Sequence, residues 1–88
     1  MIEREIIVSN KAGIHARPAA LLVKTASKFD SDVFFSCDGT EVNAKSIMSV
    51  MMLAAAMGST VKIKVEGSDE AEAMAALIAL FESKFNEE

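Results

Sequence analysis

The sequence predicts an α+β fold, in which three helices cover one face of a four-stranded sheet as a two-layer open-faced sandwich. Three observations predict it. Two segments alternate apolar and polar residues, as strands with one face in water do. Asp38-Gly39 lies between two short extended segments, which is typical of a tight hairpin. Other apolar residues recur at helical spacing, and packing such helices on one sheet face buries both apolar surfaces.

The first half of the chain contains three predicted strands and one helix. Residues 2–8 alternate as a strand, and the loop at residues 9–13 follows. A helix is expected from Ala16 to residue 27 or 28. Strands at residues 33–37 and 41–44 then flank the Asp-Gly turn. The inward stripe of the helix is expected to comprise Ala19, Leu22, Val23 and Ala26.

The second half predicts a short helix, a strand and a last helix. Ser46 is expected to cap the short helix, which runs to about Ala56. Residues 60–66 alternate cleanly as a strand. Asp69 and Glu72 have the spacing of a capping box for the last helix. The predicted element order is therefore β-α-β-β-α-β-α. The buried stripe of the last helix is expected to comprise Met74, Leu77, Ile78, Phe81 and Phe85.

Composition places the chain in a broad class. We expect its 88 residues to form a single domain over residues 1–88. One cysteine, Cys37, cannot form an internal disulfide, which favours a reducing compartment. We expect no signal peptide and no membrane insertion, because the N-terminal residues are charged and no apolar run is long enough. A net charge of −4 argues against non-specific nucleic-acid binding. A cytoplasmic protein is expected.

His15 is the only histidine, and it stands where a helix is predicted to begin. The first N–H groups of a helix have no partner within it, so the amides of Ala16 and Arg17 would point outward beside the ring. Pro18 has no N–H to lose, and the Arg17 guanidinium adds positive charge. This arrangement suits a phosphate bound at the helix start and a transiently phosphorylated imidazole. A solvated histidine without chemistry is the alternative.

Residues 45–58 form a second candidate site because nearly all of them are apolar. A short helix on a sheet cannot bury its whole circumference, so some of its methionines should be exposed for partner contacts. A deeply packed helix or a dimer contact is the alternative. A phosphate on Ser46 would suit a helix N-terminus and add negative charge to this surface. Basic residues in the first half of the chain favour an anionic ligand or an acidic partner, with ordinary solvated side chains as the alternative: Lys11, Arg17, Lys24, Lys28 and Lys45.

The segments "GIHARPAALLV" around His15 and "KSIM" around Ser46, together with the element order, resemble the HPr family. These are the histidine-containing phosphocarriers of the bacterial phosphoenolpyruvate–sugar phosphotransferase system. The resemblance extends over essentially the whole chain. It implies an antiparallel sheet with strand order 1-4-2-3.

The resemblance also implies a phosphocarrier rather than an enzyme, with no cofactor and no metal. His15 would accept a phosphoryl group on Nδ1 from phosphorylated enzyme I and donate it to enzyme IIA domains of sugar permeases. Arg17 would assist, and the protein is expected to be a monomer that offers one face to each partner in turn. The residues expected to dock these partners are Ala20, Leu21, Lys24, Ile47, Met48, Met51 and Met52.

Regulation at Ser46 is a further implication of the resemblance. In some lineages the matching serine is phosphorylated by the ATP-dependent HPr kinase/phosphorylase, which impairs transfer and can recruit a catabolite-control transcription factor. A regulatory branch of the family replaces the active histidine, whereas this chain keeps His15. Two alternatives stay open: a regulatory module switched at Ser46 or acting in a nitrogen-related phosphorelay, and a small phosphatase. The absence of a second evident acid–base residue argues against the phosphatase.

Overall fold

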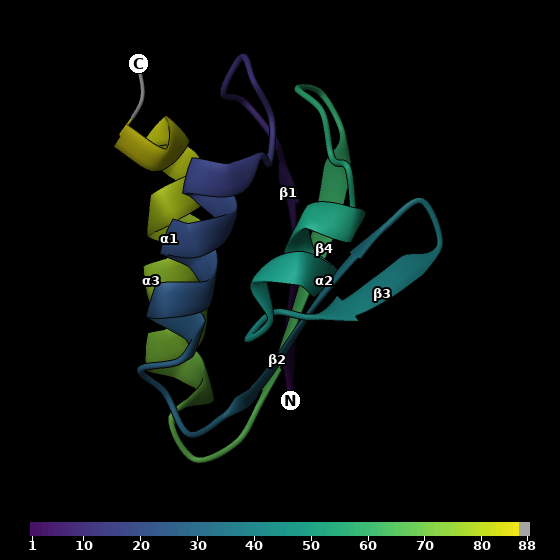
Figure 1. Ribbon diagram of the computed structural model, residues 1–88. Helices are drawn as coiled ribbons and strands as arrows, with labels where there is room; N and C mark the ends of the chain where they lie inside the picture. The colour runs from purple at the N-terminus through teal and green to yellow at the C-terminus, as the bar shows by residue number, and fades with distance from the viewer. Residues whose placement is uncertain (87–88) are drawn as a thin grey trace.

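The computed structural model describes residues 1–86 and confirms the two-layer sandwich (Figure 1). The last two residues of the domain expected over 1–88 lie outside the described residues. Within the described part, four antiparallel strands have the order β1-β4-β2-β3, as the resemblance implied. The elements are β1 Ile2–Ile7, α1 Ala16–Ala26, β2 Asp32–Cys37, β3 Thr40–Asn43, α2 Ile47–Met52, β4 Thr60–Glu66, α3 Glu70–Glu82 and a 3-10 turn at Lys84–Asn86.

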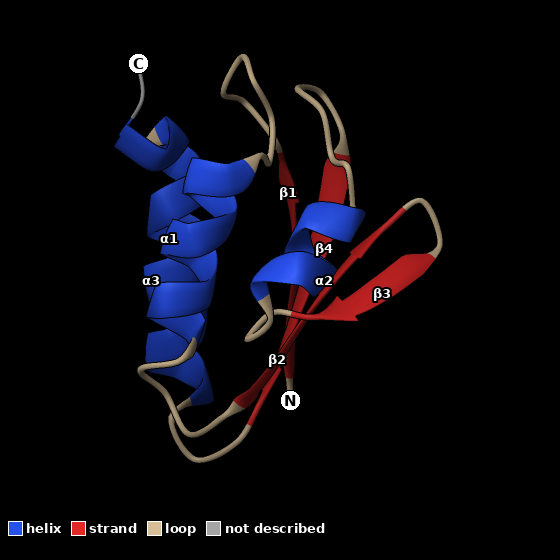
Figure 2. Ribbon diagram, in the orientation of Figure 1, coloured by secondary structure: helices blue, strands red, loops and turns tan. Residues whose placement is uncertain are grey.

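The helices lie in one layer against one face of the sheet (Figure 2). Helices α1 and α3 run side by side, and the shorter α2 packs next to α1 and close to β3. Between residues 1 and 86, no helix has both the length and the apolar character needed to cross a membrane. The loops before α1 and before β4 meet at the same end of the molecule, which positions the candidate site.

Strand β4 lies between β1 and β2, and its alternation separates the two faces of the sheet. Ile63 pairs with Phe35 of β2, and both side chains are fully buried under the helices. Lys62 and Lys64 are half-buried and belong to the opposite, open face. The polar residues therefore cover the face in contact with water, as the period of two predicts.

The core joins the sheet to α1 and α3 through apolar and aromatic side chains. Phe81 of α3 contacts Phe35 and Phe85 edge to face, with ring centroids 6.2 Å and 5.0 Å apart. Two residues expected in the inward stripes, Val23 and Ile78, are only half-buried. They lie at the margins of the helix faces and pack against the core from outside.

Helix α2 is shorter than the sequence predicted. It ends at Met52 rather than near Ala56, because Ala54 adopts a left-handed backbone conformation with φ of 52°. The chain then leaves the helix direction, and the Ala55 carbonyl accepts a hydrogen bond from Ile14 N–H at 2.8 Å. A contact with the loop before α1 therefore replaces the expected last turn of α2.

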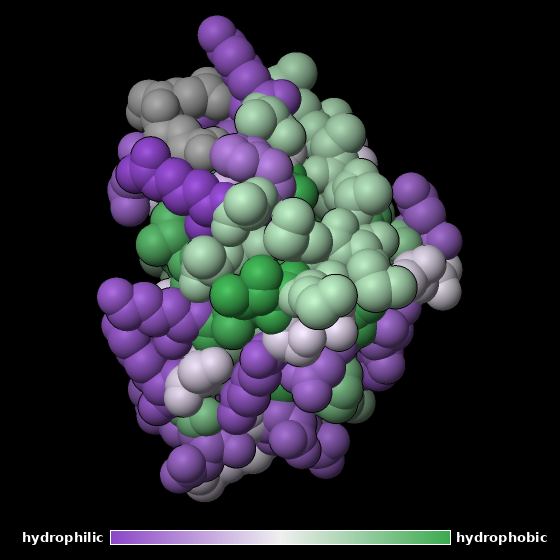
Figure 3. Space-filling model, viewed as in Figure 1, coloured by the Kyte–Doolittle hydropathy of each residue, from purple (hydrophilic) through white to green (hydrophobic). Residues whose placement is uncertain are grey.

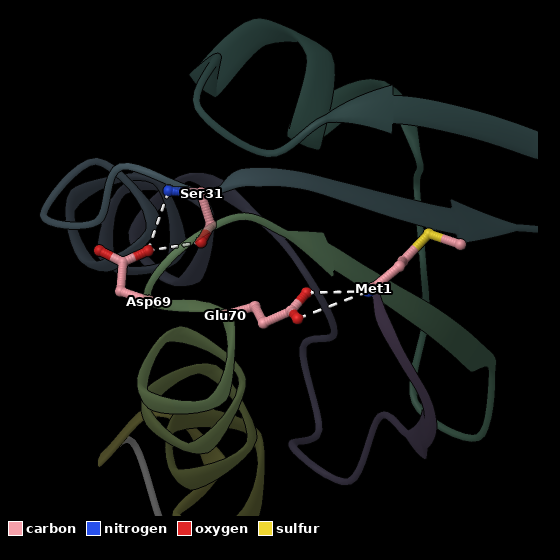
Figure 4. Close-up of polar contacts among 4 residues, drawn as sticks. All are labelled: Met1, Ser31, Asp69 and Glu70. Atoms are coloured by element: carbon pink, nitrogen blue, oxygen red, sulfur yellow. Dashed lines mark hydrogen bonds and ion pairs between the residues drawn. The ribbon is translucent and has the colours of Figure 1, made fainter.

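The expected capping box at the start of α3 is also wrong. Asp69 is the N-cap residue, but its carboxylate makes no capping hydrogen bond. It instead accepts a hydrogen bond from the backbone N–H group of Asp30 at 2.9 Å. It also accepts hydrogen bonds from the Ser31 N–H, at 3.0 Å, and from the Ser31 hydroxyl (Figure 4). Asp69 thus ties the start of α3 to the turn that follows α1.

Candidate functional site

The structure places His15 at the N-cap of α1, where the sequence predicted it. Its backbone is extended (φ −117°, ψ −163°), and its carbonyl accepts the first helical hydrogen bond from Ala19 N–H at 2.9 Å. His15 is half-buried, and its imidazole makes no capping hydrogen bond. The N–H groups of Ala16 and Arg17 have no acceptor within the helix, and Pro18 has no N–H.

Positive charge accumulates at this helix start. The first turn of α1 contains no acidic residue that would offset the helix dipole. Arg17 is exposed, two residues beyond His15, whereas the exposed Lys24 lies in the last turn of the same helix. An exposed guanidinium beside N–H groups that have no acceptor within the helix favours a phosphate over a neutral ligand.

A tightly bonded loop presents His15. The fully buried Asn10 side chain donates from Nδ2 to the Gly13 carbonyl at 2.7 Å, and Gly13 N–H donates back to the Asn10 carbonyl at 3.2 Å. Gly13 has φ of 71°, and a Cβ there would lie 2.5 Å from the Ala55 carbonyl oxygen. The bond between Ile14 and Ala55 fixes this loop to the segment after α2.

Sequence reasoning missed two of these supports. The sequence places Gly13 in the loop at residues 9–13, but no local pattern indicates its close approach to Ala55. Asn10 was passed over within "SNKAG", although asparagine close before glycine is a common turn signal. Both residues act by holding the backbone that leads to His15.

Four side chains of α2, Ile47, Met48, Met51 and Met52, form what we call the apolar face. Their exposed fractions are 45%, 78%, 44% and 73%, so the expected exposure is found. Figure 3 shows a broad apolar area where α2 faces the viewer, bordered by hydrophilic side chains. Val50 points into the core and fixes the orientation of the helix.

Helix α1 borders the apolar face with a mixed surface. Ala20 and Lys24 are exposed and Leu21 is half-buried, so the structure brings the expected docking residues of the two helices onto neighbouring elements. Lys28 is exposed in the turn that follows α1. Lys45 has another role, because its Nζ donates to the Phe29 carbonyl at 2.9 Å and ties the chain before α2 to the end of α1.

Ser46 is the N-cap of α2, as predicted. Its Oγ accepts a hydrogen bond from Ser49 N–H at 3.4 Å, and the residue is half-buried. The hydroxyl therefore lies at the start of the helix that carries the apolar face. A negative charge added there would alter the electrostatics of this surface directly.

Other features of the described chain do not indicate a second reactive site. Among residues 1–86, no three histidine, cysteine, aspartate or glutamate side chains come together as a metal-binding group. A cavity of about 440 Å³ between the end of α1 and α3 is lined by Phe29 and Leu80, among others, but not by His15. Burial and then the Asp38 charge raise the pKa of the buried Cys37 thiol, which disfavours a reactive thiolate.

Comparison with known proteins gives a consistent family signal. Residues 2–83 match the family model PTS-HPr, described as the PTS HPr component phosphorylation site. The chain is 54% identical over 88 residues to the phosphocarrier protein HPr of Xylella fastidiosa strain 9a5c, covering 100% of this chain and 99% of that protein. It is 51% identical over 84 residues to the HPr-like protein Crh of Halalkalibacterium halodurans, covering 96% and 100%.

A solved structure agrees along the whole chain. The crystal structure of HPr-C-His from Thermoanaerobacter tengcongensis superposes with a TM-score of 0.96 at 55% identity, covering 100% of this chain and 99% of that one. Its similarity therefore extends to the loops that carry the candidate site.

Proposed function

The chain belongs to the HPr family of phosphocarriers of the phosphotransferase system, and from that premise we propose that it carries a phosphoryl group transiently on His15. The group is accepted from phosphorylated enzyme I and passed to enzyme IIA domains of sugar permeases in the cytoplasm. The protein acts as a carrier, a single domain that returns to its starting state after each transfer, rather than as an enzyme with a substrate of its own.

The position of His15 at the N-cap of α1 is the single observation that carries this proposal. An imidazole nitrogen attacks phosphorus, the bond to the donor breaks, and the new P–N bond holds the group on Nδ1. The developing negative charge lies beside the N–H groups of Ala16 and Arg17, and the Arg17 guanidinium adds a charged donor. Transfer onward reverses these steps on the acceptor.

Docking is proposed for the apolar face together with the neighbouring surface of α1. The carrier must leave one partner before it meets the next, so its contacts should be adaptable and its free form monomeric. Exposed methionines suit such contacts, because their flexible thioethers fit different surfaces. Lys24 and Arg17 add positive charge that favours acidic partner surfaces.

A second role, regulation through Ser46, is favoured by the position of its hydroxyl at the start of α2. Phosphorylation by an ATP-dependent HPr kinase/phosphorylase would add about two negative charges beside the apolar face. This would weaken docking of enzyme I and offer a new surface to a catabolite-control transcription factor. Crh of Bacillus subtilis, to which the chain is 41% identical, is described as the catabolite repression HPr, and this description supports a regulatory role.

The deciding experiment is the intact mass of the protein after incubation with phosphoenolpyruvate, Mg²⁺ and enzyme I. We expect one added phosphate that is lost on brief acidification, because a P–N bond is acid-labile. The variant His15→Ala should gain none while keeping the same far-ultraviolet circular dichroism. An undiminished gain on the variant would contradict the proposal.

A parallel incubation with ATP and HPr kinase tests the second role. An acid-stable phosphate that disappears in Ser46→Ala would support it. If only this second gain occurred, the protein would be a regulatory module rather than a carrier. No gain from the kinase would remove the regulatory role and leave the carrier proposal unchanged.

A further inference from the structure

Met48 and Met52, both in α2, are the most exposed methionines of the chain. The sequence contains six methionines, of which Met48 and Met52 are 78% and 73% exposed. Side chains four residues apart lie one above the other on a helix, so these two thioethers form one stripe on the apolar face. Met74 in the core is only 4% exposed. The most accessible thioethers of α2 are therefore concentrated on a surface proposed to bind partners.

We propose that Met48 and Met52 are a site of reversible oxidation by hydroperoxides. Their sulfoxides suppress phosphoryl transfer because they weaken the binding of partners to the apolar face. The regulatory part of this inference rests on the proposed function. The modification site itself rests on exposure and thioether chemistry alone.

The chemistry requires only the thioether and a hydroperoxide such as hydrogen peroxide. The sulfur lone pair attacks one peroxide oxygen, the O–O bond breaks, and a sulfur–oxygen bond forms. The sulfur loses two electrons, and the second oxygen leaves as water with both peroxide protons. Methionine sulfoxide reductases reverse the change, so the site can return to its starting state.

The consequence follows from where the new oxygens would lie. Each sulfoxide places a strong dipole on a surface that is apolar over α2 (Figure 3). A partner that covers this surface must then desolvate polar groups for which its own apolar residues provide no hydrogen bond. The segment after α2 is bonded to the loop before His15 through Ala55 and Ile14. Oxidation would thus act at the rim of the phosphoryl site without changing the histidine.

Other oxidisable groups of the described chain are less suited to this role. Cys37 is buried, and its raised pKa keeps the thiol protonated and slow to react. Met1 is 65% exposed, but its amine pairs with Glu70 at 3.1 Å, at the start of α3 rather than beside α2. Met57 is 58% exposed and follows α2, which makes it a matched control.

The first test is a peptide map of the whole protein after graded exposure to hydrogen peroxide. We expect Met48 and Met52 to gain one oxygen each before Met51, and Met74 to remain unmodified while the protein stays folded. Cys37 should remain a thiol under the same conditions. If Met74 or Cys37 were oxidised first, the proposed site would be wrong.

The second test compares the initial rate of phosphoryl acceptance from enzyme I before and after peroxide treatment, with each protein compared with its own untreated sample. Oxidation should lower the rate of the natural chain about tenfold or more. The loss should be absent in Met48→Leu/Met52→Leu, persist in Met57→Leu, and be reversed by the reductases. An unchanged rate in the oxidised natural chain, or an equal loss in the double variant, would overturn the proposal.

The two tests also separate this proposal from the proposed function. If the untreated natural chain accepted no phosphate, the carrier function and its oxidative regulation would both fail. The peptide map would still decide the modification site in that case. If the untreated chain accepted phosphate and oxidation had no effect, the carrier function would stand and the regulatory inference would fall.

Discussion

Gly13 sets the path of the loop that presents His15, and its replacement gives the first prediction. In Gly13→Ala, the new Cβ would meet the Ala55 carbonyl oxygen at 2.5 Å in a left-handed conformation with φ of 71°. We expect the free energy of unfolding, measured by urea denaturation, to fall by about 1–3 kcal/mol. Phosphoryl acceptance should also slow, because the loop must shift.

Gly39→Ala is the matched control for this change. Gly39 also has a positive φ, of 83°, but a Cβ there would have no neighbour within 4 Å. The free energy of unfolding of this variant should fall only by the cost of placing alanine in a left-handed conformation. Its rate of phosphoryl acceptance should be unchanged. Equal losses in the two variants would show that the contact between Gly13 and Ala55 contributes nothing.

Arg17 provides a second prediction at the same scale. In Arg17→Ala, the rate of phosphoryl acceptance should fall about tenfold to a hundredfold, because a charged donor beside the phosphate is lost. Lys28→Ala removes the same charge from an exposed position in the turn after the same helix. Its rate should remain close to that of the natural chain. A similar decrease in both would indicate general electrostatic attraction rather than a local role at His15.

Asp69 makes stability depend on pH. Hydrogen bonds from the Ser31 hydroxyl and from the Asp30 N–H hold the pKa of this carboxyl below its usual range. A lowered pKa in the folded state stabilises the protein above the pKa of an unfolded aspartate, about 3.9, and the gain is lost as pH falls through the folded pKa. Ser31→Ala should therefore lower Tm at pH 7, by an amount that shrinks in this acidic range.

Ser83→Ala is the control for that series of thermal scans. The Ser83 hydroxyl donates to the Leu80 carbonyl, at 3.0 Å, and no carboxylate takes part. Any change in Tm should therefore be independent of pH. If the Tm difference of Ser31→Ala were equally constant down to pH 2, the link between Asp69 and Ser31 would not be the cause.

The sequence predicts the position of a residue correctly where the signals that determine it lie nearby in the sequence. His15 and Ser46 start helices, and both could be placed because the signals for a helix start lie within a few residues. The role of Asp69 was missed because its partners are near residue 30, on another part of the chain. Asn10 was missed because its burial depends on the elements that enclose the loop.

At the scale of elements, β4 and α2 differ in how far their sequences determine their bounds. The strand was predicted over residues 60–66 and has those bounds, because a strict alternation fixes which side chains are buried. The helix was predicted to continue to about Ala56, because Gly58 shortly after it is a typical helix end. Its early end depends on the hydrogen bond from Ile14 to Ala55, a tertiary contact that local propensity does not contain.

The left-handed residue after α2 gives a prediction at this scale. Ala54 has φ of 52°, which is unfavourable for alanine and acceptable for glycine. Ala54→Gly should therefore raise the free energy of unfolding by about 0.5–1 kcal/mol, measured by urea denaturation. Ala56→Gly is the control, because Ala56 is exposed as well but has no positive φ. It should give no gain, and a loss of stability in Ala54→Gly would contradict the argument.

For the whole molecule, alternation and helical spacing were sufficient to predict the layers but not the order of strands. The order came from the resemblance to the HPr family, because pairing is decided by contacts distant in sequence. Strand β1 pairs with β4, so that Ile2 lies opposite Val65. Alternation predicts which face of each strand is buried, but it does not predict which strands are neighbours in the sheet.

Because β2 is an inner strand under the helix layer, Cys37 can report how the whole core opens. Its side chain is 4% exposed, and burial and the Asp38 charge raise its pKa, so reaction with a thiol reagent requires both exposure and deprotonation. We expect native Cys37 to react with 5,5′-dithiobis(2-nitrobenzoic acid) orders of magnitude more slowly than in urea, at a rate that follows global unfolding. The variant Ser36→Cys/Cys37→Ser places a thiol on the open face and should react at once. Fast labelling of the natural chain in the absence of urea would mean that the sheet opens locally beneath the helices.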